Sequence, residues 1–225
     1  MEDWTDHRLS RRRALGTAAA GAAGLSLAGL NNRAAGARER RLPIARDGAF
    51  DWGVSAGLPT SNAIVLWTRV GELDRSARVT LEVAKDADFR RVVFRRRVNA
   101  RRNKDFTVHA IVRRLRPQTE YFYRFSTLKS ASRVGRFRTL PPPDSLEPVR
   151  IGFYSCQNYQ AGFYNAHSGL AGEPDVDLVI CLGDYVYENR AYEGPREDTT
   201  GDNRDGDVQL LHEWRQKYRL YQSDP

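Results

Sequence analysis

The sequence contains few of the residues that build disulfide-rich or histidine-rich proteins. Its 225 residues include two cysteines, one methionine and four histidines. Two cysteines are too few for a disulfide framework, and four scattered histidines do not make a histidine-rich metal site. Apart from one run near the N-terminus, no segment approaches the length needed to cross a bilayer. The length leaves room for one large domain or two small ones.

Positive charge is abundant, with a net charge of +8 and a pI near 9.8. Eight of the arginines lie within the first 41 residues: Arg8, Arg11, Arg12, Arg13, Arg33, Arg38, Arg40 and Arg41. Many of the others alternate with apolar residues in strand-like segments, which indicates a solvated sheet face. Attraction of anionic substrates over long range is a second use for this charge. We expect no nucleic acid as a stable partner.

The N-terminus has the pattern of an export signal. Arg11 and Arg12 precede an uncharged run from Ala14 to Leu30, and Ala35-Gly36-Ala37 follows as a small-residue cleavage site. This order is typical of a signal peptide, and the paired arginines indicate the twin-arginine type. We therefore expect a signal peptide over residues 1–37, recognition by the twin-arginine export machinery, and a periplasmic or extracellular location. An uncleaved membrane anchor is the alternative.

After a basic linker over residues 38–47, residues 48–140 are predicted to form a β-sandwich. Several short segments alternate polar and apolar residues, with turn-forming residues between them. The predicted strands are 62–70, 78–84, 91–98, 106–113, 120–126 and 134–139. Residues 115–124 match the pattern L-x-P-x-T-x-Y-x-Y, which resembles the corner of fibronectin type III domains, where a tyrosine hydroxyl bonds to the chain upstream. An unrelated sandwich with a chance match is the alternative.

Residues 148–225 differ in character from the segment before them. We predict a strand over 148–154, a helix over 158–170 and a strand over 177–182 that is buried on both faces. Strand, helix and strand form a βαβ unit and hence a parallel sheet. After a polar loop, apolar residues at helical spacing from 208 to 221 predict a helix, with Asp207 as its N-cap.

Chemically active residues follow the two predicted strands. Ser155-Cys156-Gln157-Asn158 comes after the first, and Gly183-Asp184-Tyr185-Val186-Tyr187-Glu188 comes after the second. Ligands bind at the carboxyl ends of parallel strands, so these segments are expected to lie side by side. A thiolate, a carboxylate and a phenolate together suit a highly charged cation such as Fe(III). Two metals about 3.5–4 Å apart orient and polarise a phosphoester and generate a hydroxide nucleophile.

The two motifs, the segment from Phe50 to Arg69 and the segment from Leu211 to Pro225 resemble the alkaline phosphatase D (PhoD-like) family. The resemblance implies a fibronectin-III-like sandwich followed by the start of an α/β metallophosphoesterase sandwich. It also implies that Cys156 and Tyr187 ligate Fe(III), that Asp184 bridges iron to Ca(II), and that Tyr185 packs. The substrate class is a phosphomonoester or phosphodiester. Leu58, where the family usually has Asp, departs from the pattern outside the metal motifs.

Further metal ligands of this family come from later Asn-His, Asp and His motifs, and the 225 residues do not contain these motifs. We therefore expect an incomplete chain that is inactive alone, with structural roles for His109, His167 and His212. Catalytic and substrate-binding residues are not assigned. The alternative is a non-catalytic binding module or decayed remnant. For the individual residues, the alternatives are a Cys156–Cys181 disulfide, Asp184 as a turn residue and Tyr187 as a loop aromatic.

Overall fold

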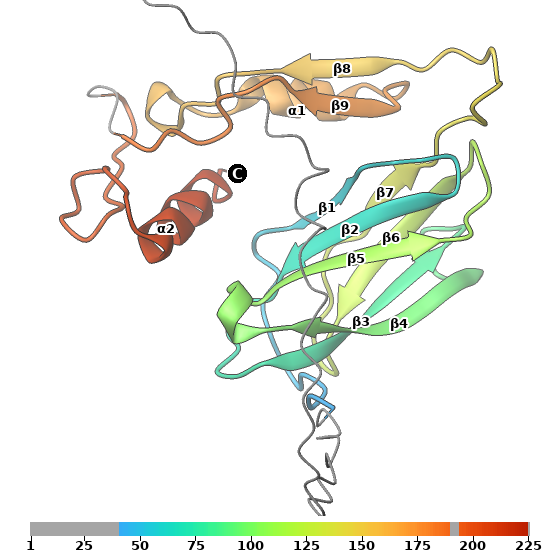
Figure 1. The fold of residues 1–225 in the computed structure, drawn as a ribbon, viewed down its shortest axis with the longest axis horizontal. Helices are drawn as coiled ribbons and strands as arrows, with labels where there is room; N and C mark the ends of the chain where they lie inside the picture. Colours follow the sequence, from blue (N-terminus) through green and yellow to red (C-terminus); the bar gives the residue numbers. More distant parts are fainter. Residues whose placement is uncertain (1–40, 190–193, 225) are drawn as a thin grey trace, which may run out of the picture. The chain divides into compact units, whose positions relative to one another are not determined.

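A computed structural model describes residues 41–189 and 194–224 of the protein (Figure 1). The expected signal peptide, residues 1–37, and the first three linker residues lie outside the described residues. Residues 41–225 form one compact unit. Within the described ranges, no helix is long and apolar enough to span a membrane.

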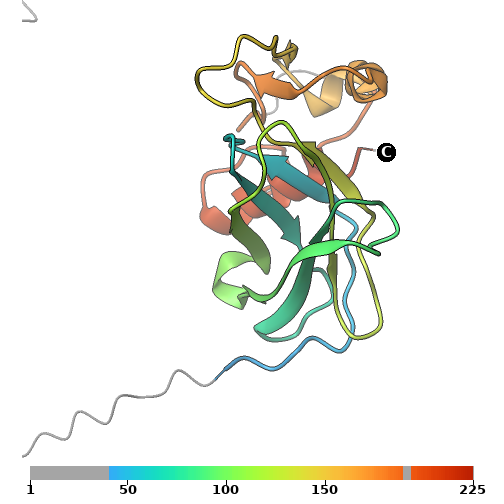
Figure 2. The ribbon, with the colours of Figure 1, turned by 90° about the vertical axis from the view of Figure 1, so that its right-hand side faces the viewer.

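Seven antiparallel strands form a two-sheet β-sandwich (Figure 1, Figure 2). The three-stranded sheet has the order β1-β2-β5, and the four-stranded sheet has the order β4-β3-β6-β7. In chain order the strands are β1 Val54–Gly57, β2 Ala63–Arg69, β3 Ala77–Ala84, β4 Val92–Ala100, β5 Thr107–Arg113, β6 Glu120–Ser126 and β7 Gly135–Arg138. The last six lie within two residues of the predicted bounds, whereas the short β1 was not predicted.

Alternation of side chains along each strand builds the core. In β5, Val108, Ala110 and Val112 are buried, while the residues between them are exposed. Both sheets direct such residues inward, and Leu66, Leu81 and Phe125 are fully buried. Ala45, from the described part of the linker, joins the same core, and Ile44 forms a β-bridge with Arg78. The core of the sandwich is therefore contiguous and includes the residues that lead into it.

The predicted tyrosine corner is present. The hydroxyl of Tyr121 accepts a hydrogen bond from the backbone N–H of Arg116 at 2.9 Å, five residues upstream. Thr139 adds to this corner, because its hydroxyl donates to the Arg116 carbonyl at 2.6 Å and accepts from the Thr119 N–H at 3.0 Å. The ring of Tyr121 stacks on Phe137 with 5.4 Å between centroids. The prediction of a tyrosine hydroxyl bonded upstream is confirmed.

The C-terminal segment begins with a parallel βαβ unit, as predicted. Strand β8 (Ile151–Tyr154) pairs in parallel with β9 (Leu178–Cys181), and helix α1 (Asn165–Gly172) lies in the crossover. The helix predicted over 158–170 is shorter than expected. A 3₁₀ turn, η2 (Tyr159–Ala161), comes first. Gly162, with φ of 140°, then breaks the helical conformation before α1 begins.

Two further expectations for this segment are wrong. The second strand is not buried on both faces: Val179 and Ile180 of β9 are 45% and 39% exposed, because the described sheet has only two strands. The last helix, α2 (Leu211–Tyr221), has Leu210 rather than Asp207 as its N-cap. Glu213 caps the helix, since its carboxylate accepts the N–H groups of Gln209 at 2.9 Å and Leu210 at 2.7 Å.

Candidate metal centre

The loops that follow β8 and β9 continue the pairing of the two strands. The N–H of Leu182 donates to the Tyr154 carbonyl at 2.8 Å, and the N–H of Cys156 donates to the Gly183 carbonyl at 3.2 Å. The N–H of Gln157 then donates to the Asp184 carbonyl at 3.1 Å. The two motifs are thus held side by side at the carboxyl edge of the sheet, as expected for a ligand site in a parallel sheet.

Both loops turn sharply at the residues that carry the chemistry. Cys156 has φ of 59° and Asp184 has φ of 52°, a left-handed conformation that is unusual for residues other than glycine. Gly183, with φ of 143°, adopts a conformation for which glycine is suited. Such backbone geometry costs about 1–3 kcal/mol per residue and is concentrated at functional sites. Eight other non-glycine residues have the same left-handed conformation, so at Cys156 and Asp184 it marks two sharp turns and does not by itself identify a site.

Two side chains converge on one carboxylate oxygen of Asp184. The thiol of Cys156 donates to Oδ2 of Asp184 at 3.4 Å, and the hydroxyl of Tyr187 donates to the same oxygen at 3.2 Å. Cys156 and Asp184 are exposed, and Tyr187 is half-buried. Burial, followed by the contacts with Cys156 and Asp184, raises the pKa of the Tyr187 phenol. The structure thus brings together all three residues that the sequence predicted as metal ligands.

Neighbouring side chains hold the second loop in place. The amide of Gln157 donates to the Tyr185 carbonyl at 2.8 Å, and the hydroxyl of Tyr185 accepts a hydrogen bond from the Gln222 amide. The Tyr187 N–H donates to the hydroxyl of Tyr221 at 3.4 Å. Tyr185 also packs on Tyr218, with 6.2 Å between ring centroids, and burial raises its pKa. Tyr185 is therefore a packing residue, and sequence reasoning did not find the supporting roles of Gln157, Tyr221 and Gln222.

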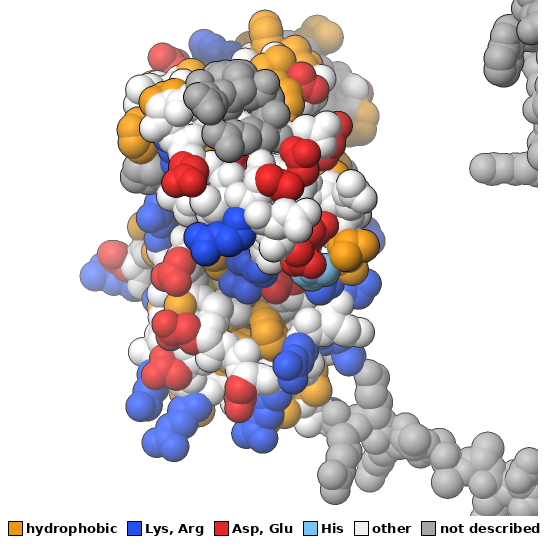
Figure 3. Space-filling model, turned by 90° about the vertical axis from the view of Figure 1, so that its left-hand side faces the viewer, with side chains coloured by type: hydrophobic (Ala, Val, Ile, Leu, Met, Phe, Trp, Pro, Cys, Tyr) orange, Lys and Arg blue, Asp and Glu red, His pale blue; other side chains and the backbone are white. Residues whose placement is uncertain are grey.

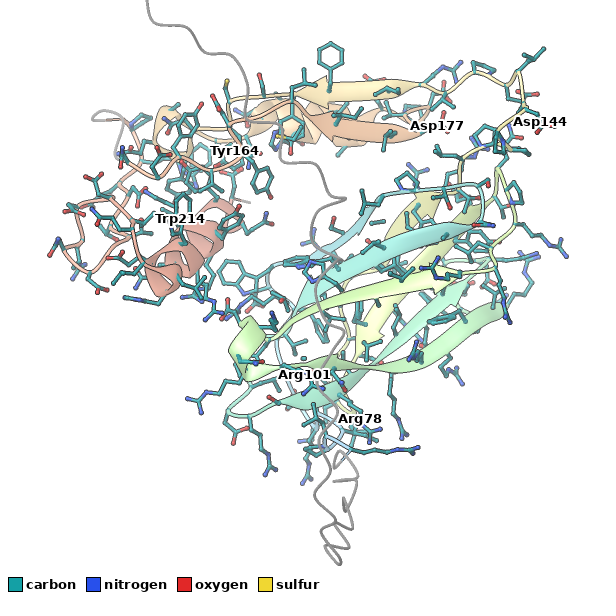
Figure 4. The ribbon with its side chains drawn as sticks, in the orientation of Figure 1. Arg78, Arg101, Asp144, Tyr164, Asp177 and Trp214 are labelled. Carbon is teal, nitrogen blue, oxygen red and sulfur yellow. The ribbon has the colours of Figure 1, made fainter. Side chains whose placement is uncertain are left out.

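Two further residues near the two loops have structural roles. His167 packs its ring against Tyr154 at 4.4 Å and Tyr164 at 5.3 Å. Figure 4 shows Tyr164 among the crowded side chains between the loop after β8 and α2. Arg196 forms an ion pair with Asp224 and lies 3.6 Å from the centre of the Tyr159 ring. Its guanidinium is therefore committed to packing this loop.

The two cysteines do not form a disulfide. Both are free thiols, and Cys181 donates to the Gly183 carbonyl at 3.5 Å. Cys181 is half-buried, so it is not the fully buried core thiol that its apolar surroundings in the sequence suggested. Cys156 remains available to the cluster with Asp184 and Tyr187.

A second group of potential ligands lies at the start of α2. The ligand atoms of Asp202, His212 and Glu213 lie within 4.8 Å of one another, with Nε2 of His212 2.8 Å from Oδ1 of Asp202. Both oxygens of Glu213 already accept backbone N–H groups, one of them from Asp202 at 2.9 Å. These bonds, led by that of Leu210, lower the pKa of Glu213 to about 2. Glu213 of this group therefore serves as the cap of α2.

The donor set at the carboxyl edge of β8 and β9 fits a highly charged cation. A thiolate, a carboxylate and a phenolate are all anionic donors, and a nearby cation favours their deprotonated forms. A hollow of about 220 Å³ adjoins Cys156 and is lined by Asn158, Tyr164 and His167 among others. Cys156 is thus accessible from this hollow, and access from outside is what a site that binds both metal and substrate requires.

The chain is similar to known phosphatases over most of its length. The sequence model for the N-terminal domain of PhoD-like phosphatases matches residues 36–141, and the model for PhoD-like phosphatase matches residues 151–225. The chain is 36% identical over 217 residues to "Alkaline phosphatase D" of Bacillus subtilis (strain 168), a match that covers 90% of this chain and 36% of that protein.

A solved structure described as "Structure of PhoD" is 34% identical, with a TM-score of 0.69 over 82% of this chain and 36% of that one. The chain therefore spans about a third of the length of the relatives that it matches. Two consecutive family matches, which together cover most of the sequence, and the similarity in fold lead to one conclusion: the chain belongs to the PhoD-like phosphatase family.

Proposed function

We propose that this chain supplies the first part of the metal centre of an exported, metal-dependent phosphoester hydrolase. The observation that carries the proposal is the convergence of Cys156 and Tyr187 on one carboxylate oxygen of Asp184, at 3.4 and 3.2 Å. The family match supports a phosphatase. The backbone hydrogen bonds that pair the two loops support a shared site at this edge of the sheet.

Cys156 and Tyr187 would hold Fe(III), and Asp184 would bridge iron to Ca(II). Carboxylate oxygens suit calcium, and the thiolate and phenolate suit the more highly charged ion. Bound metals of this kind polarise a phosphoester and lower the pKa of coordinated water. Three donors do not fill the coordination shells of two metals, so the complete site would need further ligands.

The substrate class is a phosphomonoester or phosphodiester, and the reaction takes place outside the cytoplasm. The twin-arginine pattern at Arg11 and Arg12 supports this location, because it is an export signal. The twin-arginine route exports proteins that have already folded. A protein of this family would then acquire its metals before export. The expected partners are the phosphoester substrate and the export machinery.

Metal loading tests the proposal with matched variants. The chain is loaded with Fe(III), and bound iron is measured by elemental analysis together with the visible charge-transfer absorption of an iron–phenolate bond. Cys156→Ala is expected to lose most of the bound iron, whereas Cys181→Ala retains it. Tyr187→Phe is expected to lose the charge-transfer band, whereas Tyr185→Phe keeps it. Unchanged iron content in Cys156→Ala would contradict the assignment.

A further inference from the structure

The sandwich contains a large cleft that the metal centre does not use. It has a volume of about 1050 Å³ and lies along β4 and β5, each of which is the edge strand of its sheet. We call it the basic cleft, because six cationic residues line it: Lys85, Arg96, Arg97, Arg113, Arg114 and Arg116. Among the residues that line the cleft there is no Asp or Glu. Cys156, Asp184 and Tyr187 do not line it either.

The cations of the basic cleft differ from arginines elsewhere in the sandwich. Arg95 and Arg124 both bind Glu82, at 2.6 and 2.8 Å, and Arg136 pairs with Glu120 at 3.2 Å. The face drawn in Figure 3 likewise mixes acidic and basic side chains. Within the described residues, none of the six cations of the basic cleft forms an ion pair. Like charge concentrated in a concave site raises the local concentration of anions.

Protection of sheet edges accounts for only part of this charge. Charged side chains on edge strands, especially inward-facing ones, prevent edge-to-edge pairing. Arg96 fits this role, because it shares the inward-facing register of Phe94 and Val98 and pairs across the ladder with the buried Leu81. Arg114 and Arg116 lie beyond the end of β5 and have no ladder to protect. Edge protection also does not require that carboxylates be excluded from the lining.

We propose that the basic cleft binds a linear polymer of phosphate groups. Arginine guanidinium groups suit phosphate because they donate paired hydrogen bonds in a planar fork. A trough between two sheet edges accommodates a flexible chain, whereas a flat membrane surface does not fit into it. Single-stranded nucleic acid requires exposed aromatic rings for base stacking. The rings of the lining are Tyr121, which is buried, Phe94, which packs on the core, and the smaller, exposed imidazole of His109.

The proposal is tested by binding of inorganic polyphosphate of defined chain length to the whole chain, with a chelator present so that metal-centre binding plays no part. Fluorescence anisotropy of an end-labelled polyphosphate gives the affinity at several salt concentrations. Four to six phosphate contacts predict a slope of log K against log salt of about −3 to −4, at about −0.7 per contact. Orthophosphate at the same total phosphate concentration is expected not to compete.

Two variants with equal loss of charge locate the site. Replacing Arg96, Arg97, Arg113 and Arg114 with Gln is expected to weaken binding by more than ten-fold at about 0.1 M salt and to flatten the slope. Replacing Arg90, Arg91, Arg136 and Arg138 with Gln removes the same charge outside the lining and is expected to change affinity by less than about three-fold. Loss of the exposed ion pairs of these residues should have little effect on stability. Circular dichroism checks that both variants fold.

Three outcomes would overturn the proposal. Equal weakening in both variants would mean that binding follows net charge rather than the basic cleft. Anionic vesicles of phosphatidylglycerol that bind as tightly as polyphosphate, with the same dependence on the cleft arginines, would make this a membrane surface. Tight binding of duplex DNA with that dependence would make it a nucleic-acid surface. None of these outcomes bears on the metal centre, because the chelator removes its metals.

Discussion

The sandwich and the C-terminal segment (residues 148–224) are stabilised in different ways. The sandwich buries a contiguous set of apolar side chains from both of its sheets. In the described part of the C-terminal segment, the only buried apolar residues are Val208 and Tyr221, while Ile151, Phe153 and Leu182 are at least half exposed. The sandwich therefore contains its own core, and the C-terminal segment depends on other interactions.

Those interactions are polar and highly specific. Lys217 is fully buried and binds Oδ2 of Asp198 at 2.5 Å, and it also donates to the Gly206 carbonyl. Arg196 pairs with Asp224, and Glu213 caps α2. Buried ion pairs contribute little net stability compared with apolar packing, but removing one partner is costly. The loop and helix behind the metal centre are thus fixed in one arrangement without a large apolar core.

The largest expected effect distinguishes the two regions directly. Phe125→Ala, at a fully buried site in the sandwich, is expected to reduce the free energy of unfolding by about 3–5 kcal/mol, because it removes apolar contacts and leaves a cavity. Phe153→Ala, on the exposed face of β8, is expected to change it by less than about 0.5 kcal/mol. Denaturant titration measures both values. Equal losses would mean that the β8–β9 face belongs to a packed core.

Lys217→Ala is expected to destabilise the C-terminal segment by about 3 kcal/mol, because Asp198 is left buried without its cation. The loss should be local: hydrogen exchange would increase in residues 198–222 and not in the strands of the sandwich. The double variant Lys217→Met with Asp198→Asn removes the unpaired charge and should recover much of the loss. Exchange that increases equally in both regions would show that they unfold as one unit.

The sequence was sufficient to predict the strands and the side-by-side placement of Cys156 and Asp184, because both follow from local pattern. Alternation in segments such as Thr107–Arg113 marks the inward face of a strand, and the chemical groups at Cys156 and Asp184 follow apolar runs directly. The roles of Tyr221 and Gln222 could not be predicted, because the contacts of those residues with the second loop span more than 30 residues. The prediction of Asp207 as N-cap was wrong because the N-cap, Leu210, has no capping side chain of its own type in the sequence pattern. The Glu213 side chain accepts the Leu210 N–H instead.

A moderate effect is expected at the tyrosine corner of the sandwich. Tyr121→Phe removes the acceptor for the Arg116 N–H and should reduce the free energy of unfolding by about 1–2 kcal/mol. Tyr187→Phe, in the C-terminal segment, removes a hydroxyl bonded to an exposed carboxylate and should leave the free energy of unfolding nearly unchanged. Denaturant titration compares the two variants. A larger loss in Tyr187→Phe would reverse the ranking of the two regions.

The smallest expected effect is limited to low pH and to the start of α2. Backbone hydrogen bonds, above all from Leu210, hold the pKa of Glu213 at about 2, below an unfolded value of about 4.3. Because the folded pKa is depressed, the stabilisation is present above about pH 4.3 and is lost as the pH falls toward 2. The free energy of unfolding, measured by tryptophan fluorescence during denaturation, should therefore differ between the unaltered chain and Glu213→Gln. This difference should be constant at neutral pH and shrink between pH 4.3 and 2. The exposed Glu197→Gln is the matched control, and a difference that persists undiminished at pH 2 would show that Glu213 acts through packing rather than charge.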